Sequence, residues 1–274
     1  MFRTALAPMI TLLASLAARR LGPRWGGRLL GAPLTTGPFL MLLCVELGPA
    51  AAARAAQGAI TGQLAVAGFC LTYGRIAARL RPVRALPVAL GVGAGAGLLG
   101  VIANRAWLSA AVALAVILAG LLTWPDRSSA PVTERRAARW ELPARMAVSG
   151  VIVGTLVTTA PLLGPAVAGT LSALPVLLAV LTPSVHHSLG AAAAADVARG
   201  ALVSAAGTVA FLLVLSAGLV PAGPVVAFAL AVGGLLLGGR LILLPGKRIR
   251  SRRVPSGPVQ DEPVQDRWCT SCRP

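Results

Sequence analysis

Charged residues are scarce in this chain of 274 residues, and acidic residues are the scarcest. Only 12% of the sequence is charged, about half of the share found in soluble domains. Eight acidic residues stand against 25 lysines and arginines, which gives a net charge of +17. Six of the eight fall in the central segment and the tail, where they form no paired-carboxylate motif: Asp126, Glu134, Glu141, Asp261, Glu262 and Asp266.

Histidine and catalytic motifs are equally sparse. The two histidines, His186 and His187, follow Pro183 and Ser184 in what we expect to be a turn, and neighbours in sequence do not face one site. The sequence contains no Ser-His-Asp set and no phosphate-binding loop. We therefore predict that the protein is not an enzyme and has no catalytic residues.

Cysteine supplies no evident metal or redox site. Cys44 and Cys70 lie in apolar runs, where we expect packing residues. Cys269 and Cys272 form a C-x-x-C in the tail. A structural zinc site usually needs two further ligands, and a thioredoxin-like site needs a βαβ fold. We predict no metal and no cofactor.

Long apolar runs are what the sequence has in abundance. Hydrophobic residues make up 56% of the chain, and the mean hydropathy is +0.80. Apolar runs of roughly 17–25 residues are the lengths that helices need to cross a bilayer. A transmembrane barrel would need alternating strands, which are absent from the pattern. We predict an all-α polytopic transmembrane helix bundle with nine spans, at about 4–18, 27–45, 52–74, 86–104, 107–124, 146–163, 165–183, 191–217 and 221–244.

Arginine and lysine collect in every second connection between these spans. The segments after spans one, three, five and nine hold most of them, whereas the alternate connections hold only Arg54 and Arg105. Positive residues mark the cytoplasmic side of a membrane protein, so we expect the N-terminus outside and the C-terminus in the cytoplasm. Topology thus accounts for the basic excess, and we expect membrane lipids and no nucleic acid as partners.

Two interpretations of residues 1–18 remain open. The stretch has Arg3, a short apolar region and small residues at its end, as a signal peptide does. Arg19 and Arg20 follow at once, and cations directly after an apolar region oppose translocation of the chain. We favour a retained first span.

The sequence contains an internal repeat with a spacing of 142 residues. The matches include Leu21-Gly22-Pro23 with Leu163-Gly164-Pro165, Pro33 with Pro175, and Leu47-Gly48 with Leu189-Gly190. Glycine and proline matches at a fixed spacing are informative even in so alanine-rich a chain. Past residue 85 we expect the copies to diverge.

The direction of the repeat follows from the predicted topology. Five spans precede the first helix of the second copy, and an odd number inverts it. Inverted repeats are a recurrent plan of secondary transporters, whose sites lie near the midplane on broken helices. We predict a first membrane repeat of about five spans at 1–124, a cytoplasmic linker at 125–144, a second repeat of about four spans at 145–245, and a disordered basic tail at 246–274.

Two stretches carry a resemblance to a known group of proteins. Residues 5–75, with Leu-Gly-Pro at 21–23, a proline in mid-span and the acidic-x-Gly of 46–48, resemble the first half of a family of uncharacterised bacterial multi-pass membrane proteins. Residues 160–202 resemble their second half. The resemblance implies an integral protein of the bacterial inner membrane. It implies no established activity and supplies no functional residues.

The stretch GAPLTTGP, residues 31–38, interrupts the second predicted span. Proline removes a backbone hydrogen bond and kinks a helix, and lipid cannot satisfy the freed carbonyl. We expect a hinge at Pro33, Pro38 and the repeat partner Pro175, although a plain packing kink is the alternative. Thr35 and Thr36 can offer hydroxyls to the opened backbone or to a ligand. Leucines replace both threonines in the second copy, which predicts an asymmetric site on the side of the first half.

Polar residues near the ends of the spans are further candidates. They are Glu46, Arg54, Gln57, Asp196 and Arg199, and the repeat aligns Arg54 with Asp196 and Gln57 with Arg199. Asp196 and Arg199 share a helix face at i,i+3 and can pair. Ionisable groups at membrane depth are costly and often functional. The alternatives are a gate or proton-coupling pair, and a structural ion pair near the interface.

Two functions fit these features. The first is a secondary transporter or permease that moves a small solute by alternating access, with a site where spans two and seven meet. The second is a non-transporting structural, assembly or lipid-interacting membrane protein whose polar residues only join helices. The sequence itself names no substrate.

Overall fold

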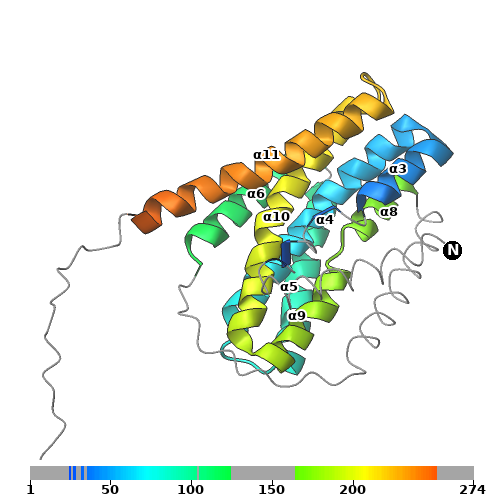
Figure 1. The fold of residues 1–274 in the computed structure, drawn as a ribbon. Coiled ribbons are helices and arrows are strands. Elements are labelled where there is room, and N and C mark those ends of the chain that lie inside the picture. The colour runs from blue at the N-terminus through cyan, green and yellow to red at the C-terminus, as the bar shows by residue number, and fades with distance from the viewer. Residues whose placement is uncertain are drawn as a thin grey trace, which may run out of the picture.

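A computed structural model describes residues 36–103, 105–124 and 164–251, together with residues 25, 27, 28, 32 and 33. Within these residues the chain is all-helical and contains no strand. The helices are α3 (Thr36–Leu47), α4 (Pro49–Ile76), α5 (Pro82–Ala103), α6 (Ala106–Leu122), α8 (Pro165–Ser172), α9 (Val176–Leu189), α10 (Ala191–Gly218) and α11 (Pro224–Ser251), shown in Figure 1.

Among the described residues, three segments are long and apolar enough to cross a membrane. They are Pro82–Ala103, Pro165–Leu189 and Ala191–Gly218, and shorter apolar helices lie at Thr36–Leu47, Ala106–Leu122 and Pro224–Gly238. Large apolar side chains are exposed along the outer helices, including Leu99 on α5, Trp107 on α6 and Leu237 on α11. Such a surface is suited to lipid.

The helix positions agree with most of the predicted spans for which the structure describes residues. Two differences concern helix ends. α9 continues through Pro183 to Leu189, so the two histidines lie in its last turn and the predicted turn is wrong. α11 runs to Ser251 and so includes the first residues of the predicted tail. The spans predicted at 4–18 and 146–163 lie outside the described residues.

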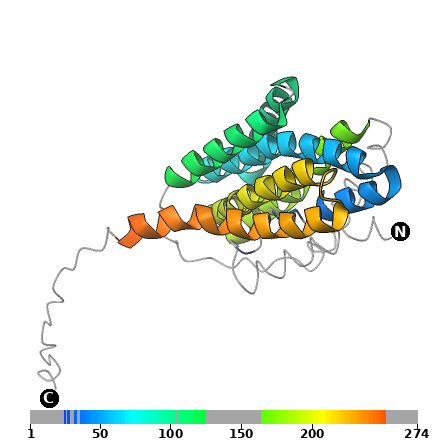
Figure 2. The same cartoon turned by 90° about the horizontal axis from the view of Figure 1, so that it is seen from above.

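Helices α4 and α10 form the centre of the molecule. α4 packs against α3, α5, α6, α8 and α10, and α10 packs against α6, α9 and α11 as well. Viewed from above, α11 and α6 lie on opposite outer sides with α4 and α10 between them (Figure 2). The chain enters α4 from α3 at one end of the bundle and enters α10 from α9 at the other end (Figure 1), so the central helices are antiparallel. Both are rich in buried alanine, which allows close approach of helix backbones.

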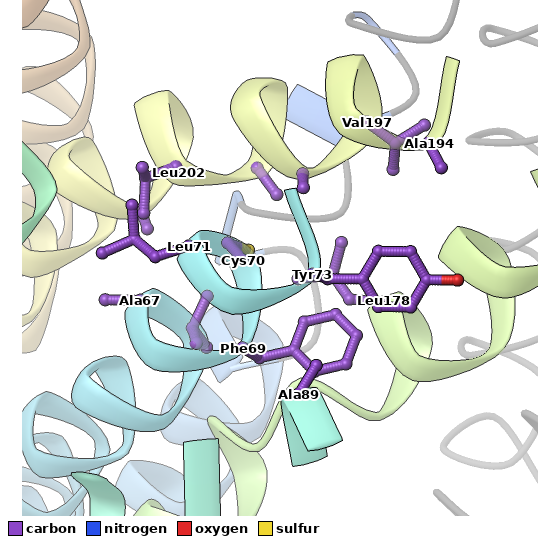
Figure 3. Packing of buried hydrophobic residues seen from close by; sticks show 14 of the residues in the cluster. Ala67, Phe69, Cys70, Leu71, Tyr73, Ala89, Leu178, Ala194, Val197 and Leu202 are labelled. Carbon is purple, nitrogen blue, oxygen red and sulfur yellow. The ribbon is translucent and has the colours of Figure 1, made fainter. Parts of the chain in front are cut away.

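A cluster of larger buried side chains joins four helices near the end of α4. The rings of Phe69 and Tyr73 lie 5.7 Å apart, and both residues are fully buried. Around them pack Ala89 of α5, Leu178 of α9 and Val197 of α10 (Figure 3). This packing holds α9 against the central pair.

Helix boundaries recur at the spacing of the sequence repeat. α4 and α10 are both 28 residues long. They follow Gly48 and Gly190, whose φ angles of 84° and 89° lie in the region that favours glycine. α5 and α11 also start 142 positions apart, at Pro82 and Pro224.

Packing contacts of α5 and α11 follow the same spacing. Gly68 of α4 approaches Val92 and Ala96 of α5, and the equivalent Ala210 of α10 approaches Gly234 and Gly238 of α11. The equivalent contacts continue past residue 85, where we expected the copies to diverge. The sequence comparison failed there because the packed residues are small but not identical.

Two glycines, one before each predicted helix break, allow close packing against the central helices α4 and α10. A β-carbon at Gly169 would overlap the backbone carbonyl of Ala55, and one at Gly27 would overlap that of Val197. The two glycines are 142 positions apart, and so are the two residues that they contact. The helical residues around Gly27 therefore lie on α10 as α8 lies on α4.

Candidate functional site

The described residues contain two helix breaks. The first, at Ala32 and Pro33, precedes α3, and the second separates α8 from α9. The amide of Ala173 donates to the carbonyls of Gly169 and Thr170, and that of Leu174 donates to Leu171 at 3.2 Å. These bonds tighten the last turn of α8 toward a 3₁₀ geometry. Pro175 has no N–H to continue the ladder, and α9 begins at the next residue.

The first break shares one backbone hydrogen bond with the second among the described residues. Ala32 and Pro33 form a bend between the helical residues 27–28 and α3. The carbonyl of Pro33 accepts from the amide of Gly37 at 2.8 Å, as the carbonyl of Pro175 accepts from the amide of Ala179 at 2.8 Å. Pro33 and Pro175 are both buried.

Both breaks line one small cavity between the central helices. Its volume is about 40 Å³, which is room for about three water molecules. The first break contributes Pro33 and Thr36, and α4 contributes Gln63 and Val66. The other lining residues are Ala32, Ser172, Ala173, Leu174, Pro175, Leu177, Leu178 and Thr208. None of these described residues carries a charge.

A side-chain hydrogen bond joins the two breaks. The hydroxyl of Thr36 donates to the backbone carbonyl of Ser172 at 3.2 Å. The hydroxyl of Ser172 itself donates to the carbonyl of Gly169 at 2.7 Å, and that of Thr208 donates to the carbonyl of Ser204 at 3.2 Å. Hydroxyls that already donate keep their oxygen lone pairs as acceptors.

One side chain of the cavity wall lacks a hydrogen-bond partner among the described residues. The side chain of Gln63 is only 4% exposed, and its Oε1 atom has no donor. Leu177 and Leu178 also line the cavity, in the first turn of α9, where a helix leaves its amides without an intrahelical acceptor and where Pro175 supplies no side-chain cap. An unpaired buried polar group costs about 1–3 kcal/mol. The cavity therefore offers both an acceptor and donors to a solute.

The lining residues come largely in repeat-related pairs, although their chemistry differs. The pairs at a spacing of 142 are Ala32 with Leu174, Pro33 with Pro175, Thr36 with Leu178, and Val66 with Thr208. The second half supplies Ser172, Thr208 and the amides of α9. Both halves therefore contribute polar groups to the cavity, and the asymmetric site predicted on the side of the first half stays a prediction.

The structure brings three of the predicted site residues to the cavity and leaves the others elsewhere. Pro33, Thr36 and Pro175 line it, whereas Thr35 lies outside the described residues. The remaining candidates do not line it: Pro38, Glu46, Arg54 and Gln57 are exposed, and Asp196 and Arg199 are half-buried on α10.

Sequence reasoning missed Gln63, Ser172 and Thr208. The available signal was a polar residue within an otherwise apolar span. The repeat did not mark these positions, because their equivalents are Ala205, Leu30 and Val66.

The far end of α9 carries a second polar contact. The hydroxyl of Tyr73 and Nδ1 of His186 lie 3.2 Å apart, with the two rings edge to face. His187 is exposed. Cys44 and Cys70 are buried free thiols, which confirms them as packing residues. Within the described ranges no three His, Cys, Asp or Glu residues come together, and the C-x-x-C motif lies outside those ranges.

Comparison with known proteins gives no function, so a function has to be argued from this geometry. No protein-family model matches the chain, and no curated protein or solved structure shows significant similarity to it. The likeness to uncharacterised bacterial membrane proteins therefore stays an expectation from the sequence.

Proposed function

We propose that this protein is a secondary transporter or permease of the bacterial inner membrane, which moves a small solute by alternating access. The observation that carries the proposal is the cavity lined by Pro33 and Pro175, one from each half of the chain. Sites between broken helices at a repeat interface are typical of secondary transporters.

Inverted-topology repeats are part of the proposal. A two-fold axis requires each contact between the halves to occur twice with the roles exchanged. The contact of Gly169 with Ala55 and that of Gly27 with Val197 meet this requirement. The antiparallel direction of α4 and α10 supports an axis in the membrane plane, between the two central helices.

Nine spans with a cytoplasmic C-terminus complete the proposed topology. The turn from α4 to α5 exposes Arg79, Arg81 and Arg84. This end of α4 also holds Tyr73, which contacts His186 at the end of α9, so the α9–α10 turn lies on the same side. The positive-inside rule makes that side cytoplasmic. A cysteine introduced in the 126–144 segment should react only with reagents that enter the cytoplasm. Labelling of this cysteine from outside would contradict both the nine-span topology and the inverted orientation of the repeats.

The two breaks are suited to act as hinges. Each contains a buried proline, and six residues before it a glycine packs against a backbone carbonyl of a central helix. Movement of α3 or α9 at its break would expose the cavity to one side at a time, because the half-helices start there. The hydrogen bond from Thr36 to Ser172 would hold the closed arrangement.

Solute flux in proteoliposomes tests the proposal. The purified full-length chain is reconstituted, and uptake of neutral, cationic and anionic probes is compared with that of empty vesicles. Flux above the empty vesicles should fall in Pro33→Ala and Thr36→Ala, and Asp196→Asn tests whether a proton drives it. If no probe moves, or flux ignores changes at the cavity, the non-transporting structural or lipid-interacting role replaces transport.

A further inference from the structure

We propose that the cavity takes a small neutral solute of the amide class, one that carries both N–H donors and a carbonyl-type acceptor, with urea as its prototype. The inference rests on the proposed transport function and names its substrate class. It follows from three properties of the cavity, which are its charge, the sense of its unpaired polar groups and its size.

The charge of the cavity argues against ions. Its described lining contains no acidic or basic side chain. Burial of an ion without a compensating charge is far more costly than burial of a neutral polar group. Most carbonyls at the end of α8 already accept hydrogen bonds, as Gly169, Thr170, Leu171 and Ser172 do. These oxygens are therefore less available to coordinate a cation.

The unpaired groups call for a solute of mixed hydrogen-bonding character. Gln63 Oε1 requires a donor, whereas the first-turn amides of α9, at Leu177 and Leu178, lack an intrahelical acceptor. The Thr36 hydroxyl already donates to Ser172, so its oxygen can also accept from a donor. A carbonyl facing the first turn of α9, with N–H groups facing Gln63 and Thr36, satisfies these groups together. A simple anion offers only acceptors, and an ammonium-type cation offers only donors.

The size of the cavity is compatible with a small solute. A volume of about 40 Å³ accepts about three water molecules or a comparable planar solute. Urea has this scale, whereas its dimethyl derivative is larger and has lost donors. Apolar walls at Pro33, Val66 and Pro175 suit the faces of a flat molecule.

Three planar probes of nearly equal shape test the inference. Urea is neutral with donors and an acceptor, guanidinium is a cation with donors only, and nitrate is an anion with acceptors only. Uptake of each radiolabelled or ion-selectively detected probe is measured in proteoliposomes of the full chain. We expect urea to enter at least about tenfold faster than in empty vesicles, with little gain for dimethylurea, guanidinium or nitrate.

A matched pair of variants tests whether urea flux depends on the cavity. Gln63→Leu removes the unpaired acceptor at similar size, and Gln57→Leu makes the same change on the exposed face of the same helix. Urea flux should fall about tenfold in the first and stay within about twofold in the second. The thermal unfolding midpoint of Gln63→Leu should not fall, because the lost group has no partner in the described structure. A loss of flux is then not a loss of folding.

The outcomes separate this inference from the function beneath it. Flux of guanidinium or nitrate without urea overturns the amide class and leaves transport standing. Urea flux that survives in Gln63→Leu also overturns the inference, since the site must then lie elsewhere. If no probe crosses faster than in empty vesicles, the transport function and the inference fail together.

Discussion

The two helix breaks share a backbone arrangement and differ in chemistry. In each, a buried proline carbonyl accepts the amide four residues later, and a glycine upstream fits against a backbone carbonyl of a central helix. After the first break comes the hydroxyl of Thr36, and at the equivalent position of the second comes Leu178. The second break instead presents unpaired amides of α9.

This difference separates two requirements on a repeated structure. The path of the chain depends on glycine and proline, because only they permit the close contacts and the interruption. Recognition depends on side chains and free amides at the same positions, and these can differ between the halves. Two similar helix breaks can thus enclose a cavity whose two sides differ in their hydrogen-bonding groups.

The largest effect is expected from adding a β-carbon where a broken helix meets a central helix. Gly27→Ala and Gly169→Ala should each destabilise the protein by about 3 kcal/mol, because both new methyl groups overlap a backbone carbonyl. Gly95→Ala is the control, since nothing lies within 4 Å of it, and should stabilise α5 by up to about 1 kcal/mol. Thermal unfolding in detergent measures all three. Tolerance of only one of the two clashes would show that the breaks are not equivalent.

The next effect concerns transport rather than folding. Pro33→Ala and Pro175→Ala restore an N–H at each break and should allow the helix to continue. We expect flux to fall about tenfold in each, with unfolding midpoints changed by only a few degrees. If one variant transports normally, then only the other break acts as a hinge.

The sequence predicted the helices well where an apolar run is bounded by residues that end helices, such as glycine and proline. α10 occupies 191–218 against a predicted 191–217, because Gly190 before the helix and the proline and glycine of the loop at 219–223 bound a continuous apolar run. The prediction was wrong at Pro183, because a proline was read as a helix end although packing carries α9 past it. It also missed the equivalence of α5 and α11, which depends on small residues in register rather than on identical ones.

The site was predicted in its backbone and largely missed in its chemistry. Pro33, Thr36 and Pro175 stood out as features that disturb a helix. Gln63 and Thr208 disturb nothing locally, and only the packing of α4 and α10 brings them to the breaks. Free amides of α9 have no signature in residue type, so no pattern of side chains could indicate them.

A smaller effect distinguishes the hydroxyl of the first break from the backbone of the second. Thr36→Val removes the donor to the Ser172 carbonyl and should cost about 1 kcal/mol of stability. Ser172→Ala keeps that carbonyl and loses only the short-range bond to Gly169, so it should cost less. Equal losses in the two unfolding midpoints would mean that the bond between the breaks contributes nothing of its own.

The smallest effect compares unpaired groups inside and outside the cavity. Thr182 and Ser109 are buried hydroxyls without a partner among the described residues, and neither lines the cavity. Thr182→Val and Ser109→Ala should each raise stability by up to about 1 kcal/mol, because a desolvated group is removed without loss of a bond. Gln63→Leu should raise stability in the same way while it lowers urea flux about tenfold. The unpaired hydroxyls of Thr182 and Ser109 would thus only lower stability. Gln63, which lines the cavity, would also lower stability, but it would bind the solute. If Thr182→Val and Ser109→Ala reduce flux as strongly as Gln63→Leu does, the cavity has no special role, and buried polarity serves the whole bundle alike.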